Sequence, residues 1–102
     1  MFALKKSVAL TEDQVQLIAR ALADPRRYDI LKKLGTGKRC GPTPCSAMRE
    51  CIDISPATLS HHMRELEIAG LISVVREGKF ASYTARPEML KAFFDRLKSD
   101  LI

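Results

Sequence analysis

The chain has 102 residues, of which 17 are Lys or Arg and 12 are Asp or Glu, so its formal net charge is +5. This length fits a single domain, which we place over residues 1–102, and leaves no room for a separate catalytic half. A hydrophobic share of 46% excludes disorder, and the positive charge favours an anionic partner. No apolar run is long enough for a membrane span, and the lysines of MFALKK follow its apolar residues, unlike a secretory signal. We therefore expect a cytoplasmic protein with no membrane partner.

Two helices are predicted in the first third of the chain. Thr11 is a good N-cap with Gln14 three residues later, and this helix should run to about Ala23. Asp24-Pro25 combines a cap with a proline at the first helical position and opens a second helix that ends at Gly35. The apolar residues of the first helix cover more than one stripe, which predicts two buried faces, one against a second subunit: Val15, Leu17, Ile18, Ala21 and Leu22.

The cap-and-proline signal occurs twice more. Thr43-Pro44 predicts a short helix that runs to about Cys51, after a loop rich in Gly and Pro. Ser55-Pro56 predicts a longer helix to Ala69, closed by Gly70. These two helices lie close enough in sequence to form a helix-turn-helix pair.

The last third combines a hairpin with a final helix. Residues 71–76 and 79–85 are β-rich runs separated by Glu77-Gly78, which predicts a β-hairpin. From Pro87 to the end, apolar residues recur at helical spacing, and so broad a face needs a partner surface: Leu90, Phe93, Phe94, Leu97 and Leu101. The predicted fold class is mainly α with a β-hairpin wing, a winged helix-turn-helix that dimerises through its first and last helices.

The helix over 55–70 is the candidate DNA reader. Leu59, Met63 and Leu66 share one face and can pack inward, whereas the other positions are small, hydroxyl-bearing or cationic, which suits a helix in the major groove. Arg86 and two further wing cations can reach phosphates. We predict contacts to double-stranded DNA from Ser55, Ala57, Thr58, Ser60, His61 and Arg64 of the helix and from Arg76 and Lys79 of the wing. On the helix alone, an ordinary exposed face remains an equal alternative.

Four segments carry a family resemblance. ALADPRRYDIL (21–31), SPATLSHHMREL (55–66), AGLI (69–72) and REGK (76–79) with Tyr83 resemble the ArsR/SmtB winged-helix repressors over most of the chain. The resemblance implies a homodimer, an operator with two-fold symmetry, and repression relieved by a ligand or chemical signal. Ser60 and His61 match the positions that usually read bases or phosphates, whereas Pro56 and Ala57 replace the usual Gln and Ser.

The resemblance does not extend to the known metal sites of that family. Its Cys-x-Cys positions fall on Pro44 and Ser46 here, and the last helix contains neither His nor Cys. If Cys45 and Cys51 share a helix, about 9 Å of rise separates them, too far for both sulfurs to bind one ion. We therefore predict no metal and no cofactor, although a soft-metal or arsenite-responsive repressor that uses cysteine thiolates remains an alternative.

Cys40 and Cys45 are predicted to form a redox pair. Cys40 follows Lys38 and Arg39, and Cys45 falls in the first turn of the predicted short helix, so both settings favour the thiolate. A tight turn between them would bring their Cα atoms within the roughly 4.4–6.8 Å that a disulfide requires. Hydrogen peroxide or another oxidant would then be the signal, as in the redox-sensing, RexT-like members of the family. Cys51 is expected to be a buried, inert thiol.

Three alternatives compete with the interpretation as a redox-controlled repressor. Both thiols could be simple loop residues without chemical consequence. A small thiol redox enzyme lacks support, because the chain has no C-x-x-C motif and no βαβ pattern. A winged helix that binds only proteins would leave the wing cations and the positive charge unexplained. We accordingly expect a non-enzymatic, DNA-binding repressor.

Overall fold

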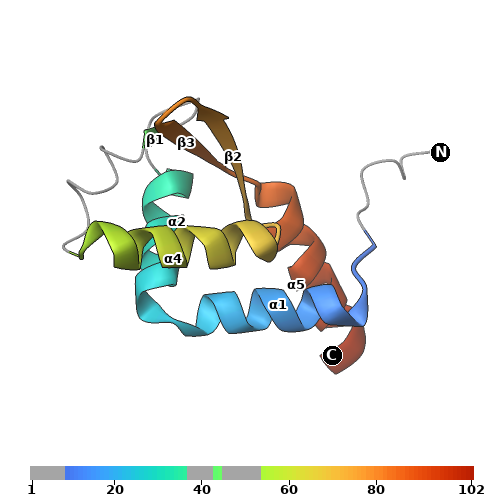
Figure 1. Cartoon of the computed structure of the whole chain (residues 1–102). Coiled ribbons are helices and arrows are strands. Elements are labelled where there is room, and N and C mark those ends of the chain that lie inside the picture. Colours follow the sequence, from blue (N-terminus) through green and yellow to red (C-terminus); the bar gives the residue numbers. More distant parts are fainter. Residues whose placement is uncertain (1–8, 37–42, 45–53) are drawn as a thin grey trace.

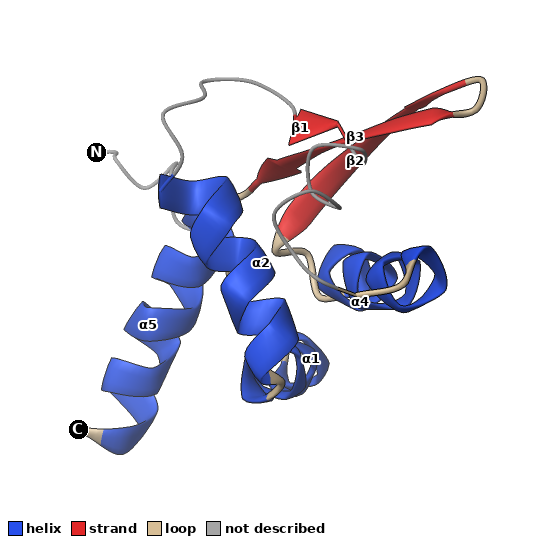
Figure 2. Ribbon diagram, turned by 90° about the vertical axis from the view of Figure 1, so that its left-hand side faces the viewer, coloured by secondary structure: helices blue, strands red, loops and turns tan. Residues whose placement is uncertain are grey.

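The computed structural model describes residues 9–36, 43–44 and 54–102. Within these residues, four helices surround a core and a small sheet extends from it (Figure 1). The elements in chain order are α1 (Glu12–Ala23), α2 (Pro25–Thr36), β1 (Thr43–Pro44), α4 (Pro56–Ile68), β2 (Ile72–Glu77), β3 (Phe80–Ala85) and α5 (Pro87–Leu101). Figure 2 shows the hairpin of β2 and β3 projecting from the helices. In this view α4 lies below the hairpin, and α5 lies on the other side of α2 from α4. This is the predicted winged helix-turn-helix class.

The predicted helix starts are confirmed at three places. The Thr11 hydroxyl accepts the Gln14 backbone N–H at 3.1 Å, and the Gln14 side chain accepts the Thr11 N–H at 2.9 Å, which completes a capping box. Asp24 caps α2 by accepting the Arg26 N–H at 2.8 Å. Ser55 caps α4, and prolines occupy the first turns of α4 and α5.

The core is built where α1, α2, α4 and the start of β2 meet. The inward face of α4 predicted from the sequence is confirmed, since its three apolar residues are nearly inaccessible to solvent. The largest fully buried side chains come from all four elements and the turn before β2: Ile18, Ile30, Leu59, Met63, Leu66, Leu71 and Ile72. Burial of this kind is the main stabilising contribution in a domain of this size.

The hairpin turn lies one residue later than predicted. Glu77 pairs with Phe80, so Gly78 and Lys79 form a two-residue loop. Gly78 has a φ of 62°, the left-handed conformation that such a tight turn requires at its first position. Lys79 therefore sits at the tip of the wing rather than in the second strand.

Thr43–Pro44 is a strand, not the start of a helix. These residues pair antiparallel with Tyr83 and Ser82, and the sheet order is β1-β3-β2. Proline is tolerated there because β1 is an edge strand, where a missing N–H removes no bond from the interior of the sheet. The prediction of a short helix was thus wrong at Pro44, and its remaining residues, 45–51, lie outside the described part of the chain.

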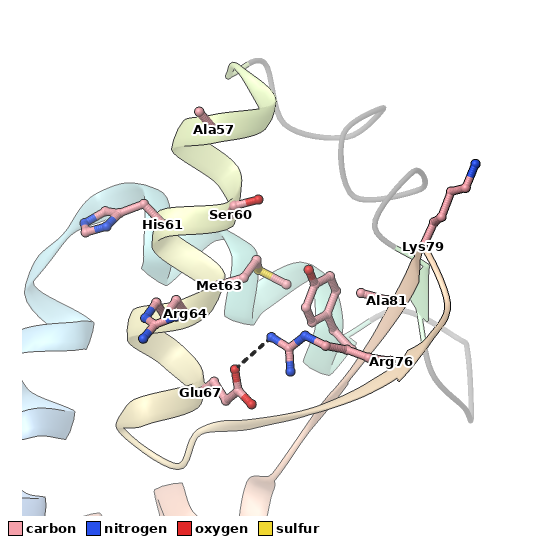
Figure 3. Close-up of a pocket in the computed structure, with 10 residues that line it drawn as sticks. Ala57, Ser60, His61, Met63, Arg64, Glu67, Arg76, Lys79 and Ala81 are labelled. Atoms are coloured by element: carbon pink, nitrogen blue, oxygen red, sulfur yellow. Dashed lines mark hydrogen bonds and ion pairs between the residues drawn. The ribbon is translucent and has the colours of Figure 1, made fainter.

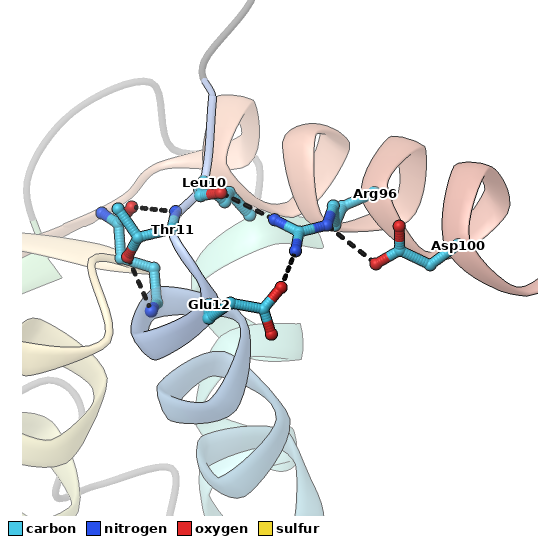
Figure 4. A network of polar contacts seen from close by, with 6 residues as sticks. Leu10, Thr11, Glu12, Arg96 and Asp100 are labelled. Carbon is cyan, nitrogen blue, oxygen red and sulfur yellow. Dashed lines mark hydrogen bonds and ion pairs between the residues drawn. The ribbon is translucent and has the colours of Figure 1, made fainter.

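Arg96 ties the last helix to the first. Its guanidinium donates to the Leu10 carbonyl at 2.7 Å, to Asp100 at 2.8 Å and to the Glu12 carboxylate (Figure 4). The start of α1 is thereby fixed against α5 by a planar fork of donors. None of the described helices is both long enough and apolar enough to cross a membrane.

The predicted apolar stripe of α5 faces two ways. Phe93 is buried in the core, and Leu90 and Leu97 pack against its margin. Phe94 and Leu101 point outward and remain 58% and 74% exposed. One side of α5 therefore completes the fold, whereas the other leaves large apolar side chains in solvent.

Two glycine substitutions should change stability in opposite directions. Gly70 ends α4 with a φ of 82°, and an added Cβ would lie 3.1 Å from the end of the Met89 side chain. We expect Gly70→Ala to lower the free energy of unfolding by about 1–3 kcal/mol. Gly35 lies inside α2, where an added Cβ meets nothing within 4 Å, so Gly35→Ala should raise it by about 0.5–1 kcal/mol.

Urea unfolding followed by circular dichroism measures both changes. Equal stability of the Gly70→Ala protein and the wild type would contradict the strain assigned to this position.

Candidate nucleic-acid interface

The outward face of α4 is exposed to solvent and carries few bulky side chains. Ala57, Ser60, His61 and Arg64 are exposed and recur at intervals of three or four residues, opposite the buried apolar face. Small side chains at the N-terminal end allow a close approach to another molecule, and the single guanidinium follows one turn later. The helix therefore presents a continuous surface with few bulky groups.

The N-terminal end of α4 is held by two hydroxyl groups. Ser55 accepts the Thr58 backbone N–H at 3.2 Å and donates its own hydroxyl to Thr58 Oγ1 at 2.8 Å. Thr58 is half-buried, so part of its side chain is engaged in capping. Both residues were predicted as DNA contacts, and both lie at the edge of the exposed face.

A groove separates α4 from the wing. It has a volume of about 520 Å³, and its lining comes from both elements, so neither forms it alone (Figure 3). The buried side chains of Met63 and Tyr83 line it together with more exposed residues. Among the described residues, the lining is Ala57, Ser60, His61, Met63, Arg64, Glu67, Arg76, Lys79, Ala81 and Tyr83. Six of the eight predicted DNA contacts thus meet at one groove.

The charges at this groove are mostly positive. Arg64 projects from the helix, and Lys79 extends from the tip of the wing, away from the helix (Figure 3). Arg76 reaches back from the wing and donates to the Glu67 carboxylate at 3.3 Å, with both side chains exposed to solvent. This ion pair joins the wing to the C-terminal end of α4.

Arg86 lies apart from the groove. It was expected to act with the wing cations, but it immediately precedes α5 and donates to the Glu88 carboxylate at 3.0 Å. Hydrogen bonds from the Glu88 backbone N–H and from Arg86 hold the pKa of Glu88 below its ordinary value. Arg86 is therefore engaged in fixing the start of α5.

Two residues near the interface were not singled out from the sequence. Glu67 continues the exposed stripe one turn beyond Arg64, and this spacing could have placed it in the groove. His62 is 6% exposed and faces inward beside Leu59 and Met63, and its Nδ1 lies 3.2 Å from an Arg27 nitrogen. Its position three residues after Leu59 indicates an inward side chain, but not its polar partner.

Burial holds the pKa of His62 below its ordinary value of 6.5. Nearby Asp24 opposes this effect, whereas Arg27, His61 and Arg26 reinforce it. At neutral pH the ring is therefore uncharged.

The three cysteines lie outside the described residues, so the structure gives no geometry for Cys40, Cys45 or Cys51. In the part of the chain that it does describe, no group of three or more His, Cys, Asp or Glu side chains could hold a metal ion. The redox pair therefore stays a prediction from the sequence.

Comparison with known proteins identifies the relatives of this chain. A family model described as a helix-turn-helix domain matches residues 22–75. An arsenical resistance operon repressor of Staphylococcus xylosus is 32% identical over 77 residues, which cover 76% of this chain and 70% of that protein.

Solved structures show the same architecture. The crystal structure of an ArsR family transcriptional regulator matches with a TM-score of 0.77 and 26% identity, covering 91% of this chain and 92% of that one. A homodimeric winged helix-turn-helix DNA-binding domain from Mycobacterium bovis, solved in solution, matches with a TM-score of 0.66 and 24% identity, covering 91% and 90% of the two chains.

Sequence and structure thus agree on one family. The relative from Staphylococcus covers three quarters of the chain, and the match to the ArsR family structure extends over 91% of it. The predicted resemblance is confirmed at this level. The chain belongs to the ArsR family of winged helix-turn-helix transcriptional repressors, which are DNA-binding proteins rather than enzymes.

Proposed function

We propose that the protein acts as a homodimer that binds a two-fold symmetric operator in double-stranded DNA. The observation that carries the proposal is the groove shared by α4 and the wing, with exposed small, hydroxyl and cationic side chains on α4 and exposed cations on the wing. α4 enters the major groove with Ala57, Ser60, His61 and Arg64 toward the bases. Arg76 and Lys79 contact phosphates or the adjacent minor groove.

The dimer is proposed to form through α1 and α5. α5 leaves Phe94 and Leu101 exposed, and a free monomer gains nothing from large apolar side chains in solvent. The Arg96 contacts fix α5 against the start of α1, so both helices can present one rigid surface to the partner. A two-fold dimer carries two reading helices, which must match half-sites about one DNA turn apart.

Binding to a duplex should depend steeply on salt. Arg76 and Lys79 give two phosphate contacts from each of two protomers, or four in all, so affinity should fall about a hundredfold between roughly 50 and 200 mM salt. Fluorescence anisotropy measures this with a labelled duplex enriched by the wild-type protein from a random-sequence pool. Affinity that does not change with salt would contradict the proposal and would favour a protein partner instead.

Arg64 should contribute to operator binding far more than a cation elsewhere. Arg64→Ala should weaken binding to the enriched duplex by about 1–3 kcal/mol if the guanidinium meets a base edge. Lys33→Ala removes the same charge from the exposed surface of α2, outside both the groove and the proposed dimer helices, and should change affinity much less. An equal loss in both variants would show that only net charge matters, and Arg64 would then not be a base contact.

We further propose that oxidation of Cys40 and Cys45 controls DNA binding. One peroxide molecule would oxidise the two thiols to a disulfide and would itself be reduced to two water molecules, taking up both thiol protons. The support comes from the cationic residues before Cys40 and from β1, which lies between the two cysteines and pairs with β3 of the wing. A covalent constraint on this segment acts next to the strand that carries the wing. The proposal places the protein in the cytoplasm, where thiols stay reduced until an oxidant arrives.

A response to arsenite is the second candidate signal. It is favoured by one observation, the similarity to an arsenical resistance operon repressor. Arsenite would need thiolates as ligands, and three cysteines are available in this chain. The two signals can be distinguished in one experiment, because each predicts release of the operator by a different reagent.

Peroxide should form a Cys40–Cys45 disulfide and release the operator, and a reducing agent should restore binding. Intact mass and peptide mapping should show the loss of two hydrogens from the peptide that carries both residues. Cys40→Ser or Cys45→Ser should abolish the reversible response with reduced binding nearly unchanged, whereas Cys51→Ser should keep it. Release by stoichiometric arsenite, with no effect of peroxide, would reject the redox signal and establish the second candidate.

A further inference from the structure

Arg27 caps the end of α1 from the first turn of α2. Its Nε donates to the Ala21 carbonyl at 3.1 Å, and its Nη2 donates to the Arg20 carbonyl at 3.2 Å. Both oxygens belong to the last turn of α1, where carbonyls have no partner within the helix and where a cation complements the helix dipole. Two of the guanidinium nitrogens are thereby fixed in space, and the direction of the third follows from the planar geometry.

The third nitrogen reaches the DNA-reading helix. Arg27 Nη1 lies 3.2 Å from Nδ1 of His62 in the middle of α4. A guanidinium can only donate hydrogen bonds, so Nδ1 must accept one and the ring proton must reside on Nε2. His62 is almost fully buried, and its ring centroid lies 5.6 Å from that of His61, which faces the groove. The contact therefore holds α4 immediately behind its exposed surface.

The apolar contacts of α4 leave its rotation less restricted. Leu59, Met63 and Leu66 are buried side by side, and hydrophobic burial has no preferred direction. A hydrogen bond weakens steeply when its angle or length changes, so it selects one rotation and one height. A small rotation of α4 would carry Ser60 and Arg64 away from the bases that they are placed to meet.

We propose that Arg27 and His62 are positioning residues that fix the rotation of the recognition helix α4 relative to the end of α1. The inference rests on the proposed DNA-binding function and adds two residues that do not touch DNA. It also requires an uncharged His62, because a protonated ring would turn an N–H toward the N–H groups of Arg27 and bring two cations together.

The pH dependence of the contact has a definite sign. The groups that face His62 are Asp24, Arg26 and Arg27 from α2 and its cap, and His61 from α4 itself. Its pKa lies below 6.5, so the contact is fully present above that pH and is lost as pH falls through the lowered value. Asp24 stays ionised over this range, because backbone hydrogen bonds from Arg26 and Arg27 lower its pKa below 3.8.

Two substitutions of His62 separate positioning from stability. His62→Asn keeps an acceptor near the place of Nδ1 but does not titrate, whereas His62→Leu keeps the bulk and has no acceptor. We expect His62→Leu to weaken binding to the enriched duplex at least about tenfold at pH 7.5, and His62→Asn to stay within about threefold of the wild type. Arg27→Lys keeps the charge but loses the fork, and should behave like His62→Leu.

The experiment measures selectivity for the enriched duplex, under conditions in which circular dichroism shows that every variant is folded. The ratio of affinities for the enriched duplex and a scrambled duplex should fall in His62→Leu and Arg27→Lys, because phosphate contacts tolerate a rotated helix better than base contacts. As the pH falls from 7.5 through the lowered pKa of His62, this ratio should fall in the wild type and stay constant in His62→Asn, in which His61 is unchanged.

Three results would overturn the proposal. A His62→Leu protein that is folded and as selective as the wild type removes the positioning role, and so does an equal pH response in His62→Asn. Nitrogen NMR of the histidine ring tests the link without DNA, and a proton on Nδ1 at pH 7.5 would contradict it. A wild-type protein that enriches no duplex would overturn the proposed function itself, a result distinct from these three.

Discussion

The burial of one face of α4 is the constraint on which the remaining structure depends. Leu59, Met63 and Leu66 lie against α1, α2 and β2, and removal of each such side chain from water contributes about 1.5–3 kcal/mol. Because the helix repeats every 3.6 residues, the same packing forces the intervening positions outward. The exposed surface of α4 and the core are therefore two consequences of one periodic pattern. The chain turns at Gly70, and Leu71 and Ile72, which lead into the wing, are buried in the same core.

Local chemistry explains how much could be predicted from the sequence. The capping box of Thr11 and Gln14 and the inward face of α4 each depend on residues within one or two helical turns. Such interactions leave a readable pattern, because the partners stand at fixed offsets along the chain. The four described helices, the hairpin and most of the exposed groove residues could be predicted from the sequence for this reason.

Features formed by distant residues left no such pattern. Pro44 looks like a helix start, but pairing with Ser82 on β3 places it in an edge strand, and nothing near Pro44 indicates that partner. The contact between Arg27 and His62 joins positions 35 residues apart, so spacing could place His62 inward without identifying its partner. The predicted position of the hairpin turn differed from the observed one by one residue, because only the pairing between the strands determines the register of a hairpin.

Glu67 gives the groove its one acidic wall residue among the lining side chains described, and its position bears on selectivity. Its ion pair with Arg76 is exposed, so the pair is worth only about 0–1 kcal/mol and a phosphate can replace the carboxylate at little cost. In the proposed complex Glu67 then faces the DNA backbone and repels it, whatever the base sequence. This repulsion lowers the affinity for every duplex by a similar factor, whereas the base contacts of α4 act only on the operator. The reduced attraction to phosphates and the fixed orientation of α4 therefore both favour the operator, because a repressor that binds all DNA tightly would rarely be free to occupy its own site.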